Sequence, residues 1–147
     1  MSKPLILVTN DDGITAPGLK ALVQVASKIG KVVVIAPDSP QSGMGHAITI
    51  NSPIRIEKSE VFDDIEAHTC SGTPVDCVKV GIFHILKRKP DLIISGINHG
   101  SNAATNVIYS GTMSAAVEGA MENIPSIGFS LDDFAHEADF KPTQHYA

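Results

Sequence analysis

Near its start the chain has the sequence Leu5-Ile6-Leu7-Val8-Thr9-Asn10-Asp11-Asp12-Gly13, an apolar run that ends abruptly in polar residues. A short, unbroken apolar run is typical of a strand that is covered on both faces, as in a parallel sheet. Asn, Asp and Gly favour turns, so the strand is expected to end after Thr9. Asp11 and Asp12 are therefore predicted at the carboxyl end of a buried strand.

The rest of the chain alternates between strand and helix patterns. An amphipathic helix is expected from Pro17 to Ile29, with Gly30 as a left-handed stop. Further elements are buried strands over 31–36, 91–98 and 124–129, short antiparallel strands within 47–70, a helix from Pro74 that Thr73 caps, and a helix that Thr112 caps. This order predicts a single α/β domain over residues 1–147, with a mainly parallel sheet and a short antiparallel insertion.

Composition limits the partners of this domain. The chain has 147 residues, 43% of them hydrophobic, and a formal net charge of −5, so no broad cationic surface is available for a nucleic acid or an anionic membrane. The first apolar run is too short for a signal peptide or a membrane span. Two cysteines, Cys70 and Cys77, are too few for a disulfide scaffold. We expect a cytoplasmic protein in which both cysteines are packing residues.

Oxygen-bearing side chains follow the predicted parallel strands. Asp11 and Asp12 follow the first strand, Ser42 lies in the loop after the second, and Asn98 ends the third. Ligands of open α/β sheets bind at this edge, where the loops converge. Carboxylate, hydroxyl and amide oxygens suit Mg²⁺ or Mn²⁺, and adjacent carboxylates repel each other unless a cation or strong donors separate them. These four residues are therefore predicted to hold one divalent cation.

A second pattern indicates anion binding. Ser110-Gly111-Thr112 opens a helix of small residues, and Ser71-Gly72-Thr73-Pro74 opens another. A helix N-terminus offers free N–H groups to a phosphate, and glycine allows a close approach, although such a start is most often only a cap. The phosphate-loop motif, the dinucleotide-binding fingerprint and the acyl-transfer Ser elbow are all absent from the sequence. Beside a hard cation, these helix starts favour the binding of a phosphate group.

Together these segments closely resemble the SurE (survival protein E) family. The resemblance runs from the first strand to about Leu131 and rests on five ordered motifs. They are Val8-Thr9-Asn10-Asp11-Asp12-Gly13-Ile14, Ala36-Pro37-Asp38 with Gln41-Ser42-Gly43, Ser71-Gly72-Thr73-Pro74, Ser95-Gly96-Ile97-Asn98-His99-Gly100 and Tyr109-Ser110-Gly111-Thr112. The family resemblance implies a Rossmann-like three-layer core and a 5′-nucleotidase that depends on a divalent metal. It also implies that the C-terminal part of the family fold, through which subunits assemble, is missing here.

The resemblance assigns roles to particular residues. It implies that Asp11, Asp12, Ser42 and Asn98 are the metal ligands, and that Asn98, Ser110, Gly111 and Thr112 bind phosphate. The expected reaction is hydrolysis of nucleoside 5′-monophosphates, with Asp11 or Asp12 as the catalytic base and one Mg²⁺ or Mn²⁺ per subunit. The expected assembly is a homodimer or homotetramer of the full-length protein. The alternative is a non-catalytic module that binds a nucleotide or phosphate.

Overall fold

A computed structural model describes residues 3–135 and 137–147. Its strands are β1 (Leu5–Thr9), β2 (Lys31–Pro37), β3 (Ile56–Ser59), β4 (Glu66–Cys70), β5 (Leu92–His99) and β6 (Ser126–Leu131). Its helices are α1 (Pro17–Ile29), α2 (Pro74–Val80), the π-helical turn η1 (Gly81–Ile85), α3 (Asn106–Tyr109), α4 (Gly111–Met121) and α5 (Lys141–Tyr146).

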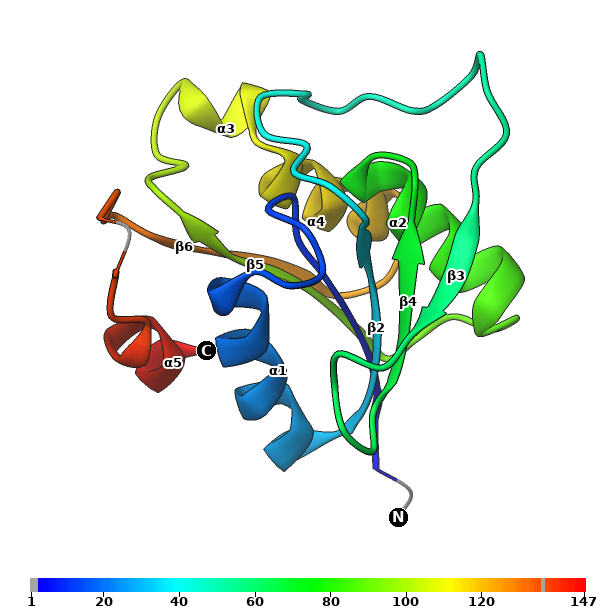
Figure 1. The fold of residues 1–147 in the computed structure, drawn as a ribbon, viewed down its shortest axis with the longest axis horizontal. Coiled ribbons are helices and arrows are strands. Elements are labelled where there is room, and N and C mark those ends of the chain that lie inside the picture. Colours follow the sequence, from blue (N-terminus) through cyan, green and yellow to red (C-terminus); the bar gives the residue numbers. More distant parts are fainter. Residues whose placement is uncertain (1–2, 136) are drawn as a thin grey trace.

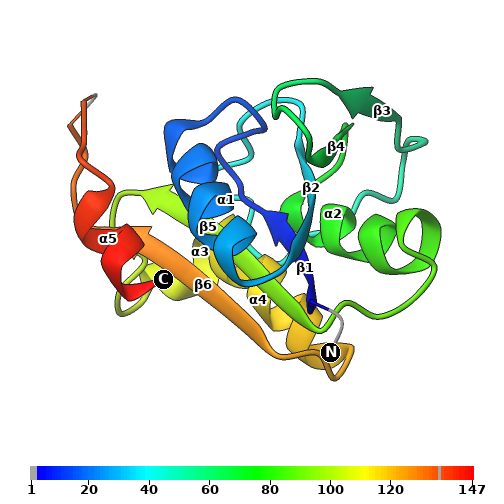
Figure 2. The same ribbon diagram turned by 90° about the horizontal axis from the view of Figure 1, so that it is seen from below.

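The strands form one sheet in the order β3-β4-β2-β1-β5-β6. All neighbours are parallel except β3 and β4, which are antiparallel. Helices α1 and α5 lie on one side of the sheet, and α2 and α4 lie on the other, as Figures 1 and 2 show. The expected three-layer α/β fold with one antiparallel insertion is confirmed.

Strand β1 is buried on both faces, as its unbroken apolar sequence predicts. Ile6 and Val8 pack in the cluster that contains the buried residues of α1. Leu5 and Leu7 pack in the cluster on the opposite face, together with residues of α2 and α4. The two helical layers therefore meet the sheet through alternate residues of the same strand.

Two sequence-based predictions about local structure are wrong. The alternation of Ile48 and Ile50 predicts a strand, but residues 38–55 form no strand or helix, and both side chains are at least half exposed. Side chains hold this segment instead, since the Thr73 hydroxyl donates to the Ala47 carbonyl at 2.6 Å. Gly30 is extended, with φ −150°, because the chain passes directly into β2. The Lys31 N–H donates to the carbonyl of Pro4, the residue before β1.

The helix predicted from Pro74 begins where the sequence indicates. Thr73 is the N-cap, and Asp76 completes a capping box with it. The regular helix ends at Val80 and continues as η1. In the described part of the chain, none of the helices has the length and apolar character needed to cross a membrane.

Candidate active site

The carboxyl ends of β1, β2 and β5 lie at the same edge of the sheet, because β1 is parallel to both neighbours. At this edge, uppermost in Figure 1, the loop after β2 lies near α3 and the start of α4. A cleft of about 200 Å³ opens there, and Asp11, Ser42 and Asn98 line it. The structure thus brings three of the four predicted metal ligands to one cleft.

Asp11 is held firmly at the floor of this cleft. Its side chain is buried, with the residue only 3% exposed. The hydroxyl of Thr112, itself fully buried, donates to Asp11 Oδ1 at 2.6 Å. Gly111 makes the close approach possible, because a Cβ at this position would lie 2.7 Å from the Cβ of Asp11. The start of α4 therefore orients the carboxylate that follows β1.

Asp12 faces a neighbouring hollow of about 230 Å³, which His99 and Phe140 also line. The backbone N–H of His99 donates to Asp12 Oδ2 at 3.3 Å. Burial, and then the nearby negative charge of Asp11, raise the pKa of Asp12 above its ordinary value. The two carboxylates therefore repel each other, which is the electrostatic condition that a bound cation would relieve.

Asn98 and Ser42 complete the predicted set from two further segments. The ladder between β5 and β6 shifts register between Ser95 and Asn98, at the point where β5 turns towards the cleft. Asn98 Nδ2 donates to the Gly100 carbonyl at 2.7 Å, and among the residues that the structure describes none donates a hydrogen bond to Asn98 Oδ1. Ser42 is exposed in the long loop after β2. Both residues carry neutral oxygen donors at the cleft.

The N-terminus of α4 opens into the same cleft. Ser110, not Thr112 as the sequence predicts, is the N-cap, because its Oγ accepts the Met113 N–H at 3.1 Å. Thr112 lies two residues after the N-cap, at the second position of the helix, and directs its hydroxyl to Asp11 instead. The N–H groups of Gly111 and Thr112 belong to the first turn, where the helix supplies no carbonyl partner. This end of α4 has the geometry that favours an anion.

Sequence reasoning missed three residues of the cleft, which are Ser101, Asn102 and Asn106. His99 and Tyr109, both in the motifs quoted above, also line it. Asn98, Asn102 and Asn106 recur every four residues, a pattern that would have marked this loop as polar and functional. Asn102 Nδ2 donates to Ser130 Oγ at 2.9 Å and thereby ties the loop to β6.

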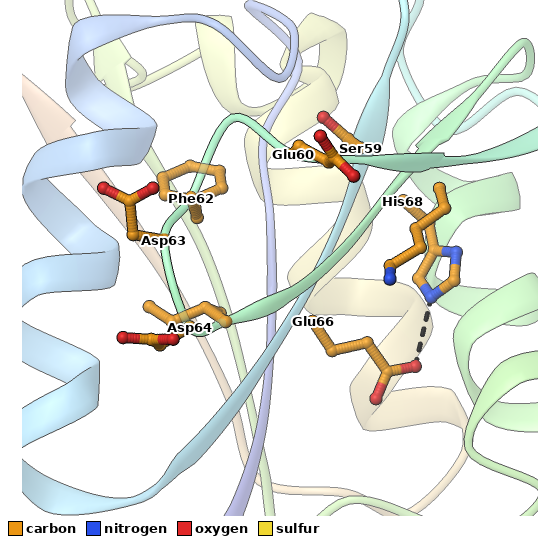
Figure 3. Close-up of a pocket in the computed structure, with 9 residues that line it drawn as sticks. Ser59, Glu60, Phe62, Asp63, Asp64, Glu66 and His68 are labelled. Carbon is orange, nitrogen blue, oxygen red and sulfur yellow. Dashed lines mark hydrogen bonds and ion pairs between the residues drawn. The ribbon is translucent and has the colours of Figure 1, made fainter.

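A larger hollow of about 710 Å³ lies beside the β3–β4 hairpin and contains none of the predicted site residues. Figure 3 shows its acidic side chains spread around the rim, with His68 Nε2 bonded to Glu66 Oε1 at 3.1 Å. Over residues 3–135 and 137–147, no three His, Cys, Asp or Glu side chains are grouped closely enough to hold a metal ion. The edge at β1 and β5, with its mixed oxygen donors, remains the better candidate site.

Comparison with known proteins identifies the family of this chain. The family model for "Survival protein SurE" matches residues 6–147. The chain is 64% identical over 145 residues to the 5′-nucleotidase SurE of Flavobacterium johnsoniae, covering 98% of this chain and 56% of that protein. It is 63% identical over 141 residues to the 5′-nucleotidase SurE of Cytophaga hutchinsonii, covering 95% of this chain and 54% of that protein.

A solved structure supports the same relationship. The crystal structure of the SurE protein from Aquifex aeolicus superposes with a TM-score of 0.86 at 41% identity, over 97% of this chain and 56% of that chain. This chain thus spans a little over half the length of the relatives that it matches. Because the family match extends over nearly every residue and the fold agrees, the chain belongs to the SurE family.

Proposed function

We propose that this protein hydrolyses nucleoside 5′-monophosphates to a nucleoside and phosphate with the help of one Mg²⁺ or Mn²⁺. The observation that carries the proposal is the cleft itself, where buried Asp11 and the open N-terminus of α4 stand side by side. A cation site next to an anion site is what a metal-dependent phosphatase requires. The name 5′-nucleotidase, which the most similar relatives carry, supports the same reaction.

The donor set fits a hard divalent cation. Asp11 and Asp12 supply two carboxylates, and Ser42 and Asn98 supply a hydroxyl and an amide oxygen, all from one edge of the sheet. The raised pKa of Asp12 supports this assignment, because two neighbouring carboxylates in a partly buried site are unfavourable without a cation. Oxygen ligands of this kind suit Mg²⁺ or Mn²⁺ better than zinc or copper.

Different residues of the protein have different roles in the proposed reaction. The Gly111 and Thr112 amides and the Ser110 hydroxyl bind the phosphoryl oxygens at the helix N-terminus. Asn98 orients the phosphate from the β5 side, and Asp11 or Asp12 accepts the proton of the attacking water. A bound divalent cation supplies charge neutralisation and lowers the pKa of water.

Few side chains of the cleft are suited to contact a nucleobase, and this determines the expected substrate selection. Tyr109 is 64% exposed at the cleft, and the chain has no Trp. We infer loose selectivity among the bases of nucleoside monophosphates, with no role for a nucleic acid polymer or a membrane. The free, buried thiols of Cys70 and Cys77 support the cytoplasm as its compartment. A homodimer or homotetramer remains part of the proposal.

The purified protein should release phosphate from a chromogenic phosphomonoester only when Mn²⁺ or Mg²⁺ is added. Its melting temperature should also rise with the cation, because a ligand that binds only the native state stabilises it by about 2.7 kcal/mol at a concentration of 100 Kd. Absorbance of the released phenolate and calorimetry measure the two effects. A raised melting temperature without turnover would favour the non-catalytic binding module instead.

Several nucleoside monophosphates should be accepted with kcat/KM values within about tenfold of one another, a spread of roughly 1.4 kcal/mol. Phosphodiesters should be poor substrates, since the α4 N-terminus and the Ser110 hydroxyl favour a dianionic terminal phosphate. A panel of monophosphates and one diester, assayed with Mn²⁺, measures this preference. Strict dependence on one base, or faster cleavage of the diester, would contradict the assignment of the pocket.

A further inference from the structure

Glu118 of α4 places a carboxylate in the protein interior, where burying a charge costs free energy. The residue is only 3% exposed. Its Oε1 accepts Lys79 Nζ of α2 at 2.6 Å, and its Oε2 contacts His46 Nε2 at 2.8 Å. Burial would raise the pKa of Glu118, but the hydrogen bonds from Lys79 and His46 outweigh it and lower the pKa below its ordinary value. Glu118 is therefore an ionised, buried group that joins three segments of the fold.

His46 belongs to the loop that carries Ser42. On one side of Ser42, the backbone N–H of Gln41 donates to the Asp11 carbonyl at 2.7 Å. On the other side, the backbone N–H of Gly45 donates to the Tyr109 carbonyl at 3.1 Å, and His46 follows immediately. Residues 42–44, between these anchors, are exposed. The contact of His46 with Glu118 is thus the first side-chain anchor after Ser42.

Helix α4 therefore contacts two of the proposed ligand segments. Thr112, in its first turn, orients Asp11, and Glu118, further along the same helix, holds the Ser42 loop through His46. Lys79 alone would compensate the charge of Glu118, because it makes the shorter of the two contacts. The side chain of His46 is 34% exposed, so its contribution to core packing is small. The contact of His46 with Glu118 therefore restrains the loop that carries Ser42.

We propose that the contact of His46 with Glu118 is a latch that positions Ser42 across the cleft from Asp11. This inference rests on the proposed function, which supplies the identity of the bound cation. A rigid helix that fixes ligands from two different loops sets their separation before a cation arrives. Residues that orient metal ligands in this way commonly change metal affinity by about 10–100-fold when they are replaced.

The test replaces His46 and measures two quantities separately, the affinity for the cation and the hydrogen exchange of the loop. His46→Ala should raise the Kd for Mn²⁺, measured by calorimetry, by about tenfold. Hydrogen exchange of the peptide that covers residues 42–48 should become faster in the same variant. His46→Gln should restore much of both properties, because its amide can donate to Glu118. His68→Ala is the matched control, since His68 pairs with Glu66 outside the cleft, and it should change neither measurement.

The two measurements separate the latch from the proposed function. If the unmodified protein does not bind Mn²⁺, the proposed function fails, and the exchange rates of residues 42–48 still decide whether the latch exists. Unchanged exchange in His46→Ala would overturn the latch. An unchanged Kd for Mn²⁺ would overturn its role in positioning Ser42, even if urea denaturation showed that the variant had lost stability.

Discussion

Asp11→Asn or Asp12→Asn is expected to lower metal-dependent phosphate release by at least ~100-fold in kcat/KM. Either substitution removes one of the two carboxylates that follow β1 at this edge of the sheet, and the neutral Ser42 and Asn98 cannot replace its charge. Steady-state kinetics with several Mn²⁺ concentrations measure the loss. Asp63→Asn is the matched control, because this exposed carboxylate lies at the β3–β4 hairpin away from the cleft.

The fold should survive both substitutions. Asn at position 11 keeps an oxygen that accepts the Thr112 hydroxyl, so the buried contact is retained. Removing either charge also relieves the repulsion that contributes to the raised pKa of Asp12. Without metal, urea denaturation should therefore show stability that is equal to or higher than that of the unmodified protein. Near-normal turnover in both variants would contradict the proposed metal site.

Asp76→Ala should produce the largest loss of stability among the changes considered, about 2–4 kcal/mol. Asp76 is 4% exposed, and its Oδ2 accepts the Thr73 N–H at 2.9 Å and the Thr49 hydroxyl at 2.6 Å. The Thr49 N–H also approaches this oxygen at 3.1 Å. Alanine has no side-chain oxygen, so these buried donors lose their common acceptor.

Urea denaturation with an unchanged m-value measures this loss. Asp139→Ala is the control, since Asp139 is exposed and, within residues 3–135 and 137–147, accepts only the nearby Lys141 N–H. It should change the free energy of unfolding by less than about 0.5 kcal/mol. A loss at Asp76 no greater than that of the control would show that the contact with Thr49 contributes nothing to stability.

Local pattern alone predicted most of the fold. The apolar run of β1 predicted a strand covered on both faces, and Ile6 and Leu7 do pack against opposite layers. Thr73, Pro74 and Asp76 predicted the start of α2 correctly, because a capping box satisfies backbone groups with side chains three residues away. The convergence of Asp11, Ser42 and Asn98 on one cleft followed from the rule that parallel strands end at the same sheet edge.

The parts that the sequence alone could not predict depend on partners far away along the chain. The Thr112 hydroxyl orients Asp11, which lies 101 residues away along the chain. The local pattern around Thr112 predicted that it is an N-cap, whereas Ser110 fills that position. Residues 47–55 have a strand-like alternation, but contacts such as that of Thr49 with Asp76 hold them as a loop. Propensity and capping act within a few residues and are visible in sequence. Compensation of a buried charge such as Glu118 requires groups from other elements, and only the tertiary structure decides which ones come within hydrogen-bonding distance.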